Sequence, residues 1–200
     1  MNDIETKRLN LKIPTMDEQY DLFNILRKEE VNKYYIVTPK RFNNREEFLI
    51  SLNDWNKQKE FYQKKIDNLN SNDYKYTWSI FLKDNTLIGQ ITVQPNSNYL
   101  NDKKIRDIGW FMDPKYQRNG YMFEVASVVL DYIFKEERIE RIETLSAAIN
   151  ISSWKLMEKL GFKRIGETNS PYLDDNGNYL LGYSYILTKE MYLNKKSNGK

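Results

Sequence analysis

A ten-residue segment from Asp113 to Met122 joins a strand-like stretch to a helical one and is suited to binding an anion. The first N–H groups of such a helix have no partners inside the helix, and they carry a partial positive charge. A glycine at position 120 lets the backbone approach a bound phosphate closely. The segment therefore predicts a phosphate site for a nucleotide-type cofactor, although a single glycine also suits an ordinary loop.

The absence of cysteine and histidine narrows the chemistry further. Disulfides, thiolate nucleophiles and zinc sites built from Cys or His are impossible, and a serine nucleophile would lack its usual imidazole base. We expect no metal site. Carboxylates, hydroxyls, amines or water must move any protons, which favours direct transfer from an activated cofactor.

The composition indicates one globular domain. The chain has 200 residues, of which 40% are hydrophobic, and this is enough for a single core. The 31 basic and 28 acidic side chains nearly cancel, so charge does not indicate a nucleic-acid partner. No apolar run approaches the roughly 18 residues of a membrane span. We expect a cytoplasmic protein that does not bind membranes, with one domain over 1–192 and a polar, disordered tail over 193–200.

The order of the elements predicts a mixed α/β fold. It has a central sheet of about seven strands, mostly antiparallel with a parallel splayed pair in the middle, flanked by about four helices. Two helices follow capping signals at Thr15 and Asn44 and extend to about residues 27 and 66. The other expected helices cover 121–135 and 151–160, the strands cover 9–13, 76–82, 86–93, 105–112, 139–148, 163–169 and 179–188, and a turn covers 174–177.

In order and spacing, several segments resemble the GNAT superfamily of acetyl-CoA-dependent N-acetyltransferases. The closest branch contains the ribosomal-protein N-terminal alanine and serine acetyltransferases, and the similarity covers nearly the whole chain. The resemblance implies a single GNAT-like domain with acetyl-CoA as its cofactor. The segments that carry it are 6–11, 87–89, 108–110, 113–124 and 150–162.

The same resemblance assigns residues to the cofactor. Gly109 marks either a bulge or splay that opens the strand for the pantetheine arm, or a plain packing position. Asn150 hydrogen-bonds the pantetheine amide, caps its helix, or does both. The implied cofactor-binding residues are Phe111, Met112, Asp113, Gln117, Arg118, Asn119, Gly120, Tyr121, Met122, Asn150 and Ser153.

Three positions depart from the family pattern. Met122 stands where a small residue is usual, so its flexible side chain either turns into the core, as we expect, or loosens the grip on the diphosphate. Arg118 replaces a frequent glycine and adds a charged donor for phosphate. Met157 stands where a tyrosine often protonates the departing thiolate, which leaves Ser153, Tyr172 or water to do so.

Asp107 is the candidate base, because an amine must lose a proton before it attacks and the resemblance places this carboxylate near the thioester. The alternative is a solvated or paired strand carboxylate. We predict direct acetyl transfer to a primary amine, either a protein N-terminus or a small molecule, by a monomer or homodimer. Region 34–76 should form the acceptor side, and it has no acidic run suited to a polyamine. Two alternatives stay open, an acyl-CoA-binding module without catalysis and an acetyltransferase of aminoacyl-tRNA.

Overall fold

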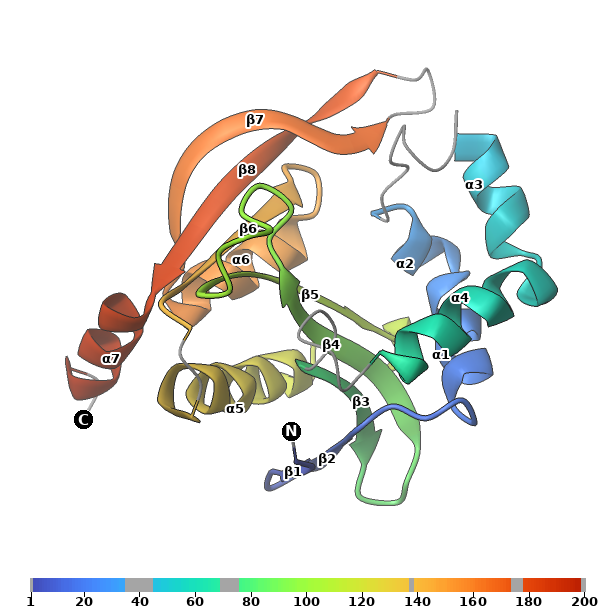
Figure 1. Cartoon of the computed structure of the whole chain (residues 1–200), viewed down its shortest axis with the longest axis horizontal. Helices are drawn as coiled ribbons and strands as arrows, with labels where there is room; N and C mark the ends of the chain where they lie inside the picture. The colour runs from blue at the N-terminus through green and yellow to red at the C-terminus, as the bar shows by residue number, and fades with distance from the viewer. Residues whose placement is uncertain (1, 35–44, 69–75, 137–138, 174–177, 199–200) are drawn as a thin grey trace.

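The computed structural model describes residues 2–34, 45–68, 76–136, 139–173 and 178–198. In this part of the chain, eight strands form one sheet with the order β1-β2-β3-β4-β5-β6-β8-β7 (Figure 1). All neighbouring strands are antiparallel except the parallel pair of β5 and β6, so the predicted mixed fold is confirmed with one strand more than expected. The strands are β1 (Ile4–Glu5), β2 (Leu9–Lys12), β3 (Tyr76–Leu82), β4 (Leu87–Pro95), β5 (Ile105–Met112), β6 (Arg141–Ala147), β7 (Lys163–Leu173) and β8 (Tyr179–Thr188).

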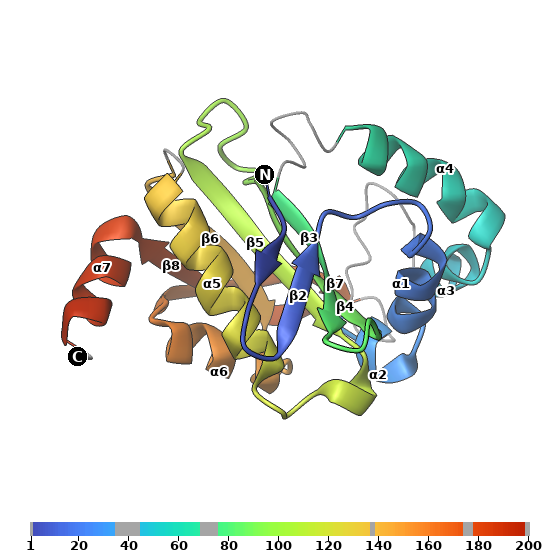
Figure 2. The same ribbon diagram turned by 90° about the horizontal axis from the view of Figure 1, so that it is seen from below.

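Helices lie on both sides of the sheet, with the first four on one side and α5 on the other (Figures 1 and 2). Helix α5 is the crossover that connects the two parallel strands, which is why they can lie side by side. None of the described helices is both long enough and apolar enough to cross a membrane. The helices are α1 (Gln19–Leu26), α2 (Glu29–Asn32), α3 (Arg45–Leu52), α4 (Trp55–Asp67), α5 (Tyr121–Glu136), α6 (Ile151–Leu160) and α7 (Lys189–Asn198).

Two hydrophobic clusters form on the two sides of the sheet. The larger one lies between the sheet and α5, whose fully buried residues recur at the spacing of one helical face. The smaller one joins α1 and α4 to residues of β4 and β5, so it holds the first helices against the strands that border the site. The fully buried residues of α5 are Val125, Ala126, Val129, Leu130, Ile133 and Phe134.

The long helix expected from residue 44 to residue 66 is two helices instead. Helix α3 ends at Leu52 and α4 begins at Trp55. Asp54 adopts an extended backbone, and its side chain accepts a hydrogen bond from the Lys57 N–H at 3.3 Å, which caps the second helix. The break lets α4 change direction and place its last turn over β4.

The C-terminal residues form helix α7 rather than the disordered tail expected from residue 193. Tyr192 is buried against the main core, and Lys196 forms an ion pair with Asp131 of α5. These contacts anchor a helix whose own sequence has little apolar patterning. The expected domain boundary at residue 192 therefore falls inside a helix, and the turn expected at 174–177 lies outside the described residues.

Gly89 permits the close approach of β4 and β5. A Cβ atom at this position would lie 2.3 Å from the carbonyl oxygen of Phe111, a backbone atom that can move only if the strand moves. We therefore expect Gly89→Ala to lower the free energy of unfolding by about 1–3 kcal/mol, as measured by urea denaturation. Gly166→Ala is the control, because a Cβ there would meet no atom within 4 Å. Equal losses in the two variants would contradict this account.

Candidate functional site

Strands β5 and β6 begin as a parallel pair and then separate. Their paired residues are Ile105 with Arg141 and Arg106 with Ile142, and the pairing ends there. The splayed pair predicted from the sequence is therefore present. On β5 the opening begins at Asp107, the candidate base, which directly follows Arg106.

Gly109 lies on the open side of this splay. It pairs in regular register with Thr92 of β4, so the strand has no bulge there. A Cβ at this position would meet no atom within 4 Å, so packing does not require glycine either. Gly109 keeps space open in the cleft.

A cavity of about 840 Å³ opens between the separated strands. Residues of β4, β5, β6, α2, α4, α6 and the loop before α5 border it. Most of the residues predicted from the sequence come together here, whereas Asp113 and Asn119 do not border the cavity. Those that do are Asp107, Phe111, Met112, Gln117, Arg118, Gly120, Tyr121, Met122, Asn150 and Ser153.

The loop before α5 presents a row of backbone donors. Among the described residues, none accepts a hydrogen bond from the backbone N–H groups of residues 118 to 123. Arg118 has φ of +63° and Gly120 has φ of +75°, and this left-handed backbone turns the chain into the helix. Such a turn at a helix N-terminus gathers N–H groups into an anion-binding concavity. The phosphate site predicted from the sequence therefore has the required donors.

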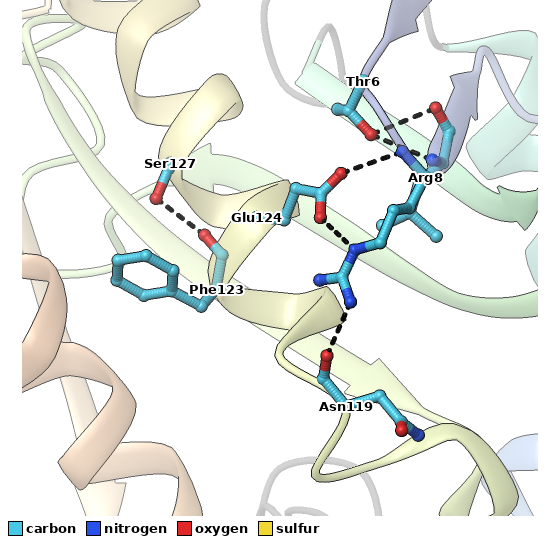
Figure 3. A network of polar contacts seen from close by, with 7 residues as sticks. Thr6, Arg8, Asn119, Phe123, Glu124 and Ser127 are labelled. Carbon is cyan, nitrogen blue, oxygen red and sulfur yellow. Dashed lines mark hydrogen bonds and ion pairs between the residues drawn. The ribbon is translucent and has the colours of Figure 1, made fainter.

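A network centred on Arg8, in the turn between β1 and β2, fixes this loop (Figure 3). Arg8 donates from Nε to Glu124 Oε2 at 2.7 Å and from Nη1 to the Asn119 carbonyl at 2.9 Å. Its guanidinium lies 4.6 Å from the centre of the Tyr121 ring. Partial burial raises the pKa of Glu124, but contacts with Thr6 and Arg8 outweigh this and hold it below its ordinary value. Sequence analysis gave Arg8 no role, since its partners lie more than a hundred residues away.

The side chains of Asp113 and Asn119, two residues that the resemblance assigned to the cofactor, support the loop. Asp113 Oδ2 accepts from Lys28 Nζ at 2.7 Å, and Oδ1 accepts from the Lys115 N–H at 3.1 Å at the start of a short 3-10 turn. The Asn119 side chain donates to the carbonyls of two preceding loop residues at 3.1 Å each. Their side chains are therefore occupied in shaping the loop.

The backbone of β5 differs in part from what the resemblance implied. The Phe111 carbonyl lies against Gly89 of β4, and the Met112 carbonyl accepts from Gln117 Nε2 at 2.9 Å. Successive residues of an antiparallel strand direct their backbone groups to opposite neighbours, so Trp110 and Met112 direct theirs toward the splay. Phe111, which the resemblance assigned to the cofactor, therefore directs its backbone groups toward β4 and not toward the splay, although Phe111 borders the cavity.

Asp107 borders the cavity where the strands begin to separate. Its Oδ2 accepts from Gln94 Nε2 at 3.4 Å, while Oδ1 is buried without a hydrogen-bond partner. Burial raises the pKa of Asp107, and contacts with Thr144, Gln94 and Ile108 oppose this only partly. Among the described residues Asp107 has no ion-pair partner, and a carboxylate with a raised pKa beside a cavity is a candidate proton acceptor.

The start of α6 forms another wall of the cavity. Asn150 Oδ1 accepts from the Ser153 N–H at 3.3 Å, so Asn150 caps the helix as predicted while also bordering the cavity. Met157 is buried and borders the cavity too. Met122 packs against the main core, in line with our expectation, and reaches the cavity as well. The side chain of Tyr172 lies outside the described residues.

Comparison with known proteins agrees with this architecture. Residues 8–163 match the family model of the acetyltransferase (GNAT) domain. The uncharacterized N-acetyltransferase YnaD of Bacillus subtilis is 35% identical over 100 residues, which are 50% of this chain and 56% of that protein. The match thus spans about half the length of that curated relative.

Solved structures share the fold over almost the whole chain. A spermidine N-acetyltransferase from Vibrio cholerae, in complex with CoA and spermine, has a TM-score of 0.74 at 17% identity, covering 94% of this chain and 99% of that one. A ribosomal-protein alanine acetyltransferase from Vibrio fischeri has a TM-score of 0.72 at 18% identity, covering 94% and 97%. Because the family model matches well over half of the residues, this chain belongs to the GNAT acetyltransferase family.

Proposed function

We propose that the protein transfers an acetyl group from acetyl-CoA directly to a primary amine, with both substrates bound at once. The observation that carries this proposal is a single cavity that reaches from the free N–H groups before α5 to the buried carboxylate of Asp107. The end at the loop before α5 suits the diphosphate of acetyl-CoA, and the end at Asp107 suits removal of a proton from the amine. The thioester and the amine can therefore meet between the two ends.

The cofactor side offers charge as well as backbone donors. Arg118, Lys155 and Lys159 border the cavity next to the loop and α6, where they would bind the phosphate groups of CoA. Asn150 and Ser153 would contact the pantetheine arm. Acetyl-CoA supplies a thioester carbonyl carbon for the amine to attack.

Asp107 supplies the proton acceptor on the other side. A protonated amine has no lone pair, so Asp107 removes one proton, directly or through a water molecule. The nitrogen then bonds to the carbonyl carbon, the carbon–sulfur bond breaks, and the nitrogen gives its second proton to water as the neutral amide forms. The thiolate takes its proton from water or a hydroxyl, because the Met157 side chain has none to donate.

Release of free CoA thiol measures the reaction. Acetyl-CoA is incubated with a panel of short peptides and small amines, and mass spectrometry identifies the acetylated nitrogen. CoA binding by calorimetry serves as the second readout. Tight CoA binding without CoA release from any amine would favour the alternative of an acyl-CoA-binding module, for which the absence of an acid at Met157 is the supporting observation.

Arg8 should strengthen CoA binding without contacting the reacting atoms. Arg8→Lys keeps the positive charge but loses the two-pronged contact with Glu124 and the Asn119 carbonyl. Since this contact is partly exposed, we expect the Kd for CoA to rise only about three- to tenfold, as measured by calorimetry. Lys7→Ala, an exposed neighbour, is the control. An unchanged Kd in Arg8→Lys would show that the loop holds its shape without this network.

A further inference from the structure

The wall of the cavity at α4 contains a lysine for which the described residues offer no negatively charged partner. Lys65 stands in the last turn of α4, and its Nζ donates to Gln90 Oε1 at 3.1 Å. Among the described residues, no carboxylate lies within ion-pair distance of this nitrogen. Burial lowers the pKa of Lys65 to about 8, so the side chain is still mainly cationic at neutral pH.

The Lys65 side chain is half-buried and borders the cavity. An ammonium that leaves water is stabilised only when an anion or several hydrogen-bond acceptors replace that water. Among the described residues Gln90 supplies a single neutral acceptor, so a substrate that displaces water from this part of the cavity must itself bring a partner for the ammonium. A cavity-lining cation of this kind is therefore suited to an anion that arrives with the substrate.

The position of Lys65 relative to Asp107 fixes the spacing that such a substrate needs. Gln90, Thr92 and Gln94 alternate along β4 and all border the cavity. Gln90 contacts Lys65 at one end of this row, and Gln94 contacts Asp107 at the other. Four residues of a strand span about 13 Å, so the strand positions that contact the ammonium and the carboxylate are roughly that far apart.

We propose that the acceptor is an acidic peptide N-terminus, whose amine binds at Asp107 and whose carboxylate binds at Lys65. This inference rests on the proposed function and names its substrate class. An extended peptide advances about 3.3–3.6 Å per residue, so an acidic side chain on the third residue reaches the required distance. A polyamine fits poorly, because the only acidic residues among the described ones that border the cavity are Glu30 and Asp107.

Three peptide amides of one length, Ala-Ala-Glu, Ala-Ala-Gln and Ala-Ala-Lys, test the proposal through kcat/KM for acetylation. We expect the wild type to prefer the Glu peptide over the Gln peptide by about tenfold, and the Lys peptide to be poorest. Lys65→Met should bring the Glu-to-Gln ratio close to one, while Lys65→Arg should retain a preference. Lys59→Met, an exposed lysine of the same helix, is the matched control and should retain the wild-type ratio. An Ala-Ala-phosphoserine peptide distinguishes carboxylate from phosphate as the preferred anion.

A binding measurement separates this inference from the proposed function. The N-acetylated Glu peptide is titrated by calorimetry into wild type and Lys65→Met, each saturated with CoA. Acetylation of all peptides at equal rates would leave the proposed function standing and overturn the inference. Binding of the Glu peptide that depends on Lys65, without acetylation of any peptide, would support the inference and overturn the function. Absence of both acetylation and binding would overturn the inference, as would a Glu preference that survives Lys65→Met.

Discussion

Asp107→Asn should lower kcat by about a hundred- to ten-thousandfold while the Kd for CoA stays unchanged. Asparagine has the same shape and keeps an oxygen that accepts from Gln94, but it cannot take a proton from the amine. Steady-state CoA release and calorimetry measure the two quantities. Asp67→Asn makes the same chemical change at an exposed position outside the cavity and is the control.

The pH dependence of the wild type should identify the same group. Burial raises the pKa of Asp107 above its ordinary 3.8, so the ionised form that acts as a base is lost at a higher pH than for an exposed aspartate. We expect kcat/KM to fall as the pH drops through this raised pKa. The residual activity of Asp107→Asn should lack that acid limb, and an unchanged limb in this variant would assign the titration to another group.

The free energy of unfolding distinguishes a carboxylate whose charge is unfavourable in the folded protein from one that supports the fold. With its pKa raised by folding, Asp107 holds a proton more tightly in the folded state, so its contribution to stability is complete below pH 3.8 and is lost as the pH rises through the folded value. Because asparagine does not ionise, the Asp107→Asn variant does not lose stability in this way as the pH rises. The variant should therefore be more stable than the wild type at neutral pH although its kcat is lower, and urea denaturation at two pH values measures the difference. Lower stability at neutral pH would indicate a supporting role instead.

Elements with strong local signals were predictable from the sequence. The segment from β5 through α5 was placed almost to the residue, because a glycine turn and an unbroken apolar helix face mark its boundaries. Helix α6 was predicted to the residue: Asn150 caps the start as expected, and Gly161 adopts φ of +105° at the end, where only glycine does so readily. Residues that signal a local backbone conformation were therefore sufficient to predict most of the elements around the proposed cofactor site.

Elements that depend on distant contacts were not predictable. Strand β1 has only two residues, and it exists because it pairs with β2. Lys65 carried no signal, since it is one of several lysines in an amphipathic helix and reaches the cavity only because the last turn of α4 lies next to β4. The role of Arg8 likewise required the fold to bring β2 next to α5. The proposed acceptor half of the site depends on such contacts, and short-range patterns in the sequence do not encode them.

Gly120→Val should raise the Kd for CoA on the order of a hundredfold. The reason is conformational, because a Cβ at this position would lie 3.6 Å from Arg8 Nη2, which is an ordinary contact, whereas φ of +75° is strongly unfavourable for a β-branched residue. The loop would relax to negative φ and turn its neighbouring N–H groups away from the phosphates. Each lost hydrogen bond to a charged group costs about 1.5–3 kcal/mol, and losing one or two gives an effect of this size.

A second substitution at the same position separates backbone conformation from side-chain bulk. Asparagine also adds a side chain at this position, but it adopts the left-handed backbone region more readily than valine does. Gly120→Asn should therefore retain much more CoA affinity than Gly120→Val. Gly166→Val controls for a general loss of stability, because that glycine lies on β7 with open space around it and no positive φ. If both variants at position 120 lose the same affinity, the cause is bulk near the phosphates. If neither loses any, the diphosphate binds elsewhere, and the N–H groups of residues 118 to 123 are not its donors.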